Sequence, residues 1–260
     1  MEKYIRVEND TIPLLGYGTY KMSGKECVES VADALNMGYR HIDTAQLYYN
    51  EDEVGQGVKN SKVDREDIFI TTKVSTHNME PDSLRYSTER SLKSLDSEYI
   101  DLLLVHWPVK DMNLDAILGT MLELKKEDKV RHLGVSNFSP SLFKKAIEKA
   151  PVICNQVEFT PYSPQNKNLE IAKNEDLMIT AYSPLVKGKI SDDAVLNEIG
   201  GKYGKTAAQV SLRWLLQLGN VSVIPKASSE QHRRENMEIF DFELDEEDMR
   251  KISELQSEDI

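Results

Sequence analysis

The chain has 260 residues, 40% of them hydrophobic and 29% charged, and its formal net charge is −12. This length and composition predict one large globular domain, residues 1–260, with a sizeable core. The acidic balance disfavours general binding to nucleic acid or to anionic membranes, because both need basic surfaces. A ligand that carries phosphate would therefore need a local basic patch.

Cysteine spacing and apolar runs indicate the compartment. Cys27 and Cys154 are far apart and form no spacing typical of a metal site, which fits a reducing environment. The N-terminal sequence MEKYIRVEND lacks the apolar core of a signal peptide, and no run of about 18 apolar residues is present. We expect a soluble cytoplasmic protein that binds no metal.

The first twenty residues predict a β-hairpin followed by a strand. Residues 4–7 and 12–15 would form the two arms, with Asn9-Asp10 in the turn. Next comes the sequence GYGT at 16–19, whose glycines would let another group approach the backbone closely.

One unit then recurs, a short apolar strand followed by a helix with one polar face. The expected strands are 15–18, 39–43, 68–73, 99–106, 130–136, 153–158, 178–182 and 221–224. The expected helices are 25–37, 51–60, 82–95, 114–127, 140–149, 167–174, 206–218 and 229–238, with extra helices at 192–203 and 246–255. Four start signals support helices: Ser23 to Glu26, Ser139-Pro140, Thr206 to Gln209 and Ser228 to Gln231.

Eight strands alternating with helices predict an α/β fold with parallel pairing. Two architectures are open, a doubly wound sheet and a closed (β/α)8 TIM barrel. The count of eight favours the barrel, here with an N-terminal β-hairpin and extra C-terminal helices. No GxGxxG motif follows the first strand, which makes a Rossmann fold the weaker alternative.

Polar side chains recur where the predicted strands end. In the stretch Gly38–Gly55, Asp43 ends a strand and Tyr48 follows in the loop, before Asn50 and an acidic helix start. Because barrel active sites form at the carboxyl ends of the strands, we expect these residues to meet at one rim. Each alone could instead be a capping, core or solvated residue, so the inference rests on their recurrence. The others are Lys73, His106 with Trp107, Ser136 with Asn137, Gln156 with Glu158, Tyr182 with Ser183, and Lys226.

Asp43, Tyr48, Lys73 and His106 together predict a proton-donor system. A tyrosine with a pKa near 10 is a weak acid, and an ammonium roughly 4 Å away contributes about 4 kcal/mol at an effective dielectric of ~20. We therefore expect Lys73, held by Asp43, to lower the pKa of Tyr48 by up to about 3 units. His106 could donate a hydrogen bond to a carbonyl oxygen. No side chain can supply hydride, so a reduction would need a cofactor.

Seven segments occur in the order of one known family. They are GYRHIDTAQLYYNE, ITTKV, YIDLLLVHWP, LGVSNF, NQVEFTPY, TAYSPL and VIPKAS, the last followed by EN. Over nearly its whole length the chain resembles an aldo-keto reductase. It resembles most the short microbial branch that includes 2,5-diketogluconate and methylglyoxal reductases.

The resemblance implies NADPH-dependent reduction of aldehydes and ketones to alcohols, in a monomer whose hairpin seals the barrel bottom. It implies Tyr48 as general acid, Asp43 and Lys73 as its tuning pair, and His106 as the residue that orients the carbonyl. The implied cofactor residues are Gly18, Thr19, Asp43, Ser136, Asn137, Gln156, Tyr182, Ser183, Pro184, Leu185, Lys226, Ala227, Ser228, His232, Glu235 and Asn236. The implied substrate residues are Tyr20, Leu47, Tyr48, His106 and Trp107.

Within the implied cofactor set, Ser136, Asn137 and Gln156 would hold the nicotinamide carboxamide while Tyr182 stacks on the ring. Ser183 and Leu185 would lie along the pyrophosphate. Lys226 and Ser228 would meet the adenosine 2′-phosphate within KASSEQHRR, residues 226–234, the densest local basic cluster. An alternative is that this cluster is only a solvated helix start.

Three departures from the family pattern affect specificity. His232 stands where relatives commonly carry an arginine, which predicts a weakened NADPH preference with measurable use of NADH. Ser75 stands where many relatives have a tryptophan, and the sequence stops at Ile260 without the long tail of larger members. Both predict an open pocket for small polar carbonyls such as 2-oxoaldehydes or keto sugar acids.

Two other functions remain open on the sequence. One is a cofactor-binding, redox-sensing module that turns over slowly, although no partner-binding extension is evident. The other is a metal-dependent barrel hydrolase or isomerase that uses Asp43, His106 and Glu158. The absence of paired histidines at metal-ligand spacing, and the presence of Lys73, disfavour a metal.

Overall fold

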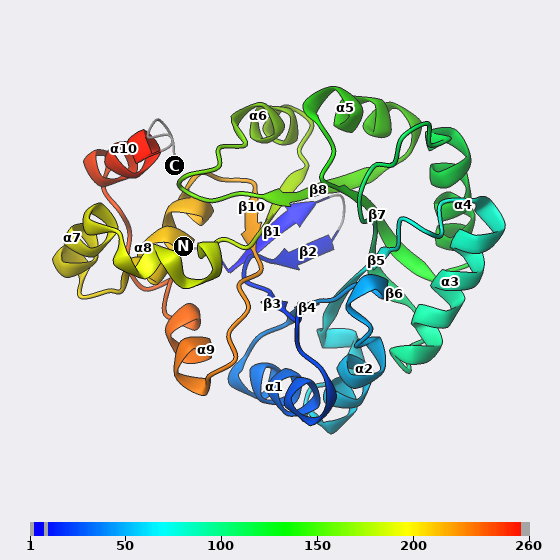
Figure 1. The fold of residues 1–260 in the computed structure, drawn as a ribbon, viewed down its shortest axis with the longest axis horizontal. Helices are drawn as coiled ribbons and strands as arrows, with labels where there is room; N and C mark the ends of the chain where they lie inside the picture. The colour runs from blue at the N-terminus through cyan, green and yellow to red at the C-terminus, as the bar shows by residue number, and fades with distance from the viewer. Residues whose placement is uncertain (1–2, 8–9, 256–260) are drawn as a thin grey trace. The chain divides into compact units, whose positions relative to one another are not determined.

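The computed structural model describes residues 3–7 and 10–255. Contacts divide the chain into two compact units, one of residues 17–156 and one of residues 1–16 with 157–260. Each unit is described separately below, and Figure 1 shows both.

The unit of residues 17–156 contains parallel strands that pair in chain order, so that each strand lies beside the next one in the sequence. This order is the one expected from alternating strands and crossover helices. The strands are β3 (Tyr17–Gly18), β4 (His41–Asp43), β5 (Phe69–Val74), β6 (Ile100–Val105), β7 (Val130–Ser136) and β8 (Val152–Glu158), the last of which belongs to this unit as far as Gln156.

Five helices cover the outer side of these strands (Figure 1). They are α1 (Gly24–Met37), α2 (Glu51–Asn60), α3 (Pro81–Ser94), α4 (Leu114–Lys126) and α5 (Pro140–Lys149). Each buries an apolar stripe and exposes charged residues, as α1 does with Val31 and Leu35 on its buried side. Gly38 ends α1 in the left-handed region at φ 117°, where a residue with a Cβ would be strained.

The inner faces of the strands carry polar residues in layers. Side chains alternate along a strand, so His41 and Asp43 share one face of β4. His41 Nε2 lies 3.0 Å from Thr71 Oγ1 on β5, and one step further along Asp43 meets Lys73. Around them the strands are apolar and fully buried, as at Leu102 on β6. The fold therefore places an ionisable pair at the carboxyl ends of β4 and β5, above a packed core.

The second unit contains the N-terminal hairpin and the last two strands of the parallel series. Strand β1 (Tyr4–Val7) pairs antiparallel with β2 (Asp10–Pro13), and β9 (Met178–Tyr182) pairs parallel with β10 (Val221–Val223). Leu15 forms a parallel bridge to Val223. The helices of this unit are α6 (Asn166–Asn174), α7 (Ala194–Tyr203), α8 (Ala207–Gln217), α9 (Glu230–Met237) and α10 (Glu246–Glu254), with a 3₁₀ segment η3 (Val186–Asp192).

The predicted order of strands and helices is confirmed, with boundaries mostly within two residues. The hairpin prediction is correct in type, but its second arm starts at Asp10 rather than Ile12. Asp10 pairs with Val7 and so belongs to the arm, whereas Asn9 lies outside the described residues. Leu15 instead leaves the hairpin to join β10.

Two of the four helix start signals are confirmed, and two need correction. Ser139 caps α5 with Pro140 in its first turn, and Thr206 and Gln209 form the full capping box of α8. Ser23 precedes α1, but its side chain makes no capping hydrogen bond. The cap of α9 is Ser229 rather than Ser228.

Candidate active site

Asp43 and Tyr48 are positioned by the end of β4 and by a short turn that follows it. Asp43 is the last residue of β4 and is 2% exposed. Tyr48 lies between β4 and α2, as expected, where it ends a single 3₁₀ turn, η1 (Gln46–Tyr48). Tyr49 then takes a left-handed conformation, with φ 53°, which stops the turn and lets α2 begin at Glu51.

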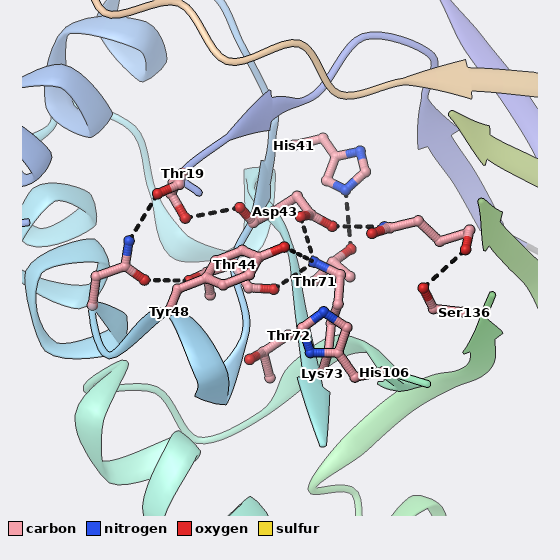
Figure 2. Close-up of polar contacts among 12 residues, drawn as sticks. Thr19, His41, Asp43, Thr44, Tyr48, Thr71, Thr72, Lys73, His106 and Ser136 are labelled. Atoms are coloured by element: carbon pink, nitrogen blue, oxygen red, sulfur yellow. Dashed lines mark hydrogen bonds and ion pairs between the residues drawn. The ribbon is translucent and has the colours of Figure 1, made fainter. Parts of the chain in front are cut away.

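The ammonium of Lys73 links the end of β4 to this turn. Lys73 Nζ donates to Asp43 Oδ1 at 2.5 Å, to the Thr44 carbonyl at 2.8 Å and to Tyr48 Oη at 3.4 Å. Three partners satisfy all three N–H groups of an ammonium. Figure 2 shows Asp43, Lys73 and Tyr48 turned toward one another. Because Tyr48 accepts from Lys73, its own O–H remains available to another acceptor.

Burial and charge act in opposite directions on this pair. Burial raises the pKa of Tyr48, Lys73 lowers it in part, and the net pKa is above the ordinary value. The predicted lowering was therefore wrong for this structure, because the estimate from Lys73 alone left out the loss of hydration. Burial lowers the pKa of Lys73, but Asp43 and Tyr48 outweigh it and the net pKa is raised. At neutral pH the phenol is protonated and the ammonium is charged.

His106 follows β6 and contributes a neutral imidazole. Its ring centroid lies 5.8 Å from that of Tyr48 in an edge-on arrangement. Burial, with a smaller contribution from the charge of Lys73, lowers the pKa of His106 to about 4, so it is uncharged near neutrality. Its Nδ1 is buried and has no hydrogen-bond partner among the described residues. A neutral imidazole can donate one hydrogen bond to an uncharged acceptor.

The ends of β7 and β8 bring three more of the predicted residues to the same unit. Gln156 Nε2 donates to Asp43 Oδ2 at 2.8 Å. This is the carboxylate oxygen to which Lys73 does not donate. Ser136 Oγ donates to the Gln156 carbonyl at 2.9 Å, and Asn137 Nδ2 donates to Ser136 Oγ and to the His106 carbonyl. These amides and hydroxyls therefore form one network with the ionisable group.

The predicted substrate residues in this unit are more exposed. Tyr20 is 51% exposed and its ring centroid lies 5.1 Å from that of Tyr48, while Trp107 is 46% exposed. Leu47 belongs to the same 3₁₀ turn as Tyr48 and is half-buried. Gly18 and Thr19 precede Tyr20, and both the N–H and the Oγ1 of Thr19 donate to the Asp43 carbonyl at 3.0 Å.

The predicted pyrophosphate residues belong to the second unit, just after β9. Tyr182 ends that strand and is half-buried, as is Ser183, which has φ 49°. Pro184 is buried and its carbonyl accepts from Ser211 Oγ at 3.2 Å. Leu185 then leads into η3.

The basic cluster at 226–234 is smaller than its sequence suggested. Arg233 is buried, and its guanidinium donates to the carbonyls of Ala227 and Ser228 at 3.2 and 2.8 Å, so it supports the loop from inside. Lys226 is exposed and forms no ion pair within the described part of the chain. Asn236 is buried, and its Nδ2 has no partner among the described residues.

Two further members of the cluster lie on the exposed face of α9. Arg234 pairs with Glu230 at 2.6 Å, which offsets its charge. His232 is exposed, and its backbone N–H donates to the Ser229 cap. Glu235 is half-buried and accepts through its carbonyl from Gln209 Nε2 at 2.9 Å.

Sequence reasoning missed the residues that hold the turn of Tyr48. Asn50 is fully buried, donates to the carbonyls of Thr19 and Met22 and accepts from Thr44 Oγ1 at 2.8 Å. Gln46 makes contacts with α3 and with the loop after β5. The only signal was their position beside Tyr48, because their partners lie in distant parts of the sequence.

Among the described residues, no three His, Cys, Asp or Glu side chains are grouped as metal ligands would be. Asp43 is paired with Lys73, and Glu158 is exposed, so the metal-dependent alternative gains no support from either. Within the same residues, no helix has the length and apolar character needed to cross a membrane.

A protonated phenol, a charged ammonium and a neutral imidazole at the ends of parallel strands suit proton transfer to an oxygen. Residues 14–257 match the Aldo/keto reductase family. The chain belongs to this family. It is therefore an oxidoreductase of carbonyl compounds.

Curated relatives cover almost the whole chain. Glyoxal reductase of Bacillus subtilis is 41% identical over 251 residues, which are 95% of this chain and 90% of that protein. Methylglyoxal reductase DkgB of Escherichia coli O157:H7 is 37% identical over 253 residues, 95% of this chain and 94% of its own.

The fold class follows from a solved structure. A crystal structure described as a 2,5-diketo-D-gluconic acid reductase B has a TM-score of 0.95 and 42% identity, and covers 98% of this chain and 92% of that one. The predicted α/β barrel fold of the aldo-keto reductases is confirmed, with its N-terminal hairpin.

Proposed function

We propose that this aldo-keto reductase reduces small polar aldehydes and ketones with NADPH, and that Tyr48 donates the proton to the carbonyl oxygen. The observation that carries the proposal is the hydrogen bond from Lys73 to Tyr48 Oη, at 3.4 Å. It leaves the phenolic O–H free to point at a substrate oxygen. The raised pKa of Tyr48 keeps that proton in place until the oxygen gains charge.

Lys73 and Asp43 stabilise the site after the proton has left. A phenolate forming at Tyr48 would accept a charge-assisted hydrogen bond from the Lys73 ammonium, which is stronger than a neutral one. Asp43 holds that ammonium at 2.5 Å, and Gln156 holds the other carboxylate oxygen. The charge that favours proton transfer is therefore fixed before substrate arrives, which is the condition for electrostatic preorganisation.

His106 orients the carbonyl. Its lowered pKa keeps the ring neutral near pH 7, so it offers one N–H donor without adding a second cation beside Lys73. Its Nδ1 has no partner in the part of the chain that the structure describes, which fits a ring whose hydrogen bonding is completed only when substrate binds. A donor aimed at the carbonyl oxygen polarises the C=O bond and stabilises the developing alkoxide.

The residues assigned to the cofactor suit a nicotinamide dinucleotide. Among the described residues, the buried amide of Asn236 lacks a partner, as a group that meets a ligand would, and Lys226 makes no ion pair and offers its charge to a phosphate. Ser136, Asn137 and Gln156 supply the hydroxyl and amides that recognise a carboxamide, and Tyr182 supplies an aromatic face. When bound, the reduced nicotinamide supplies the hydride that no side chain can.

NADPH is the better cofactor in this proposal, with NADH also accepted. The engagement of Arg233 within the loop and of Arg234 with Glu230 leaves Lys226 as the main cation for a 2′-phosphate. His232 lacks the permanent charge and bidentate geometry of the arginine common in the family.

The substrate class follows from the open end of the site. Tyr20 and Trp107 are about half exposed, and Ser75 stands where many members of the family carry a bulky aromatic residue, which favours substrates with polar substituents. The relatives named for glyoxal and methylglyoxal support 2-oxoaldehydes as a first class to test.

The test is turnover by the purified chain with NADPH and methylglyoxal, followed by loss of absorbance of the reduced nicotinamide. Tyr48→Phe removes only the phenolic oxygen, and Tyr86→Phe, at a tyrosine 65% exposed on α3, is the matched control. We expect Tyr48→Phe to lose at least a hundredfold in turnover, since positioned proton donors contribute about 10²–10⁴-fold. Tyr86→Phe should match the unmodified protein.

Three other outcomes would change the assignment. Equal turnover by Tyr48→Phe would remove Tyr48 as proton donor. Tight NADPH binding with no turnover across a panel of carbonyls would favour the redox-sensing module. Activity on bulky hydrophobic ketones with none on methylglyoxal would exclude the proposed substrate class.

A further inference from the structure

The side chain of Gln46 uses all four of its hydrogen-bonding positions. Its Oε1 accepts from the Ser75 N–H at 2.9 Å and from Asn78 Nδ2 at 3.0 Å. Its Nε2 donates to Ser87 Oγ and to Ser91 Oγ, both at 3.2 Å. An amide offers two acceptor and two donor positions, so none is left for water or for substrate. Gln46 therefore joins three segments: its own turn, the loop after β5, and helix α3.

The turn that Gln46 belongs to has little rigidity of its own. It is three residues long and its backbone bonds are Tyr48 N–H to the Ala45 carbonyl at 2.9 Å and Tyr49 N–H to the Gln46 carbonyl at 3.3 Å. A 3₁₀ turn has poorer hydrogen-bond geometry than an α-helix, and this one ends in a left-handed Tyr49. Side-chain contacts must therefore fix the place of Tyr48.

The contacts of Gln46 continue behind strand β5. Ser91 Oγ, which accepts from Gln46, also donates to Glu51 Oε2 at 3.1 Å, and Thr72 Oγ1 donates to Glu51 Oε1 at 2.6 Å. Thr72 precedes Lys73 on β5, so this cluster meets the strand that carries the ammonium from the side opposite Asp43. The turn of Tyr48, through Gln46, and the strand of Lys73, through Thr72, are thus attached to the same partly buried cluster.

We propose that Gln46 is a positioning residue that fixes the distance between Tyr48 Oη and Lys73 Nζ. It anchors the turn of Tyr48 to α3 and, through Ser75 and Asn78, sets the loop that follows Lys73. Gln46 and Tyr48 are two residues apart in a 3₁₀ turn, so their side chains leave it in different directions and Gln46 need not touch the substrate. This inference rests on the proposed role of Tyr48 as proton donor.

The test variant is Gln46→Met, which keeps the side-chain length and removes all four hydrogen bonds. Loss of the anchor should lower the single-turnover rate of NADPH oxidation by methylglyoxal roughly 10- to 100-fold, because small displacements of a reacting group are costly. The NADPH dissociation constant should change less than about twofold. The solvent deuterium isotope effect should rise, because proton transfer from Tyr48 becomes slower relative to other steps.

Control variants separate this inference from the proposed function. Gln56→Met, at an exposed glutamine on α2 that contacts Asn60, should leave all three quantities unchanged. If Tyr48→Phe keeps its activity, the proposed function fails. If Tyr48→Phe is inactive while Gln46→Met retains the wild-type rate per folded molecule and the wild-type isotope effect, only the role of Gln46 is overturned. If Gln46→Met does not fold, Asn78→Ala, which removes a single bond, decides by the same rate and isotope effect.

Discussion

Lys73 Nζ lies 2.5 Å from Asp43 Oδ1, and the two side chains are 1% and 2% exposed. Taking two charges out of water costs several kcal/mol each, and their attraction offsets this only when the remaining hydrogen bonds are also made. Here Thr44, Tyr48 and Gln156 make them. The pair is therefore explained better by a need for a fixed charge beside Tyr48 than by stability.

Asp43→Asn should destabilise the protein by about 3–5 kcal/mol, because Lys73 would remain buried without its counter-charge. Denaturant midpoints measure this change. Asp96→Asn is the control, since it removes an ion pair with Lys59 whose side chains are 66% and 70% exposed, and should cost under about 1 kcal/mol. Similar losses of stability from the two variants would mean that Lys73 can stay buried without the charge of Asp43.

The imidazole of His106 should make folding stability depend on pH. Its pKa is about 4 in the folded chain and about 6.5 when exposed, so below pH 6.5 the unfolded chain binds a proton that the folded chain does not. Stability should fall as pH drops from 6.5 to 4 by about 3 kcal/mol from this group and then level off. Urea unfolding of the unmodified protein and of His106→Gln across this range measures it. His77→Gln, at an exposed histidine, should follow the unmodified protein. If the free energy of unfolding changes with pH equally in the unmodified protein and in both variants, the assignment to His106 is wrong.

Gly55 marks the close approach of α2 to the end of α3. A Cβ there would lie 2.7 Å from the carbonyl carbon and oxygen of Leu95 and 2.8 Å from the carbonyl oxygen of Ser94, all of them backbone atoms. Gly55→Ala should therefore cost about 1–3 kcal/mol and lower the melting temperature. Gly119→Ala in α4 meets nothing within 4 Å and should instead add about 0.5–1 kcal/mol. A neutral Gly55→Ala would show that the two helices can separate freely.

Cofactor preference should respond to charge in the loop before α9 and at the start of that helix. Lys226→Met should weaken NADPH binding by about 1–2 kcal/mol, and His232→Arg should strengthen it by a similar amount. Fluorescence titrations with NADPH and NADH measure both, and NADH is the internal control because it lacks the 2′-phosphate. A Lys226→Met variant with unchanged NADPH affinity would count against the assigned phosphate site.

Patterns of local origin could be predicted from the sequence. The period of apolar residues and the caps at Ser139 and Thr206 located most elements, and the ends of the strands located Asp43, Lys73 and His106. At Ser23 the same kind of pattern marked the start of α1, but the capping hydrogen bond itself does not form.

Features that depend on three dimensions could not be predicted. Gln46 has partners that lie 29 to 45 positions away, and nothing in its neighbourhood distinguishes it from a surface glutamine. The direction of the Tyr48 pKa shift depends on how much water the fold excludes, which a pairwise charge estimate omits. A count of basic residues placed Arg233 in the phosphate patch, whereas its guanidinium donates to a carbonyl inside its own loop.

Asp43, Tyr48, Lys73 and His106 all belong to the unit of residues 17–156, whereas the loop at 226–236 belongs to the other. Under the proposed assignment, the groups that move the proton and the groups that distinguish NADPH from NADH lie in different stretches of the sequence, 43–106 and 226–236. Substitutions at 226–236 can therefore change whether the enzyme uses NADPH or NADH while the acid–base residues stay unchanged.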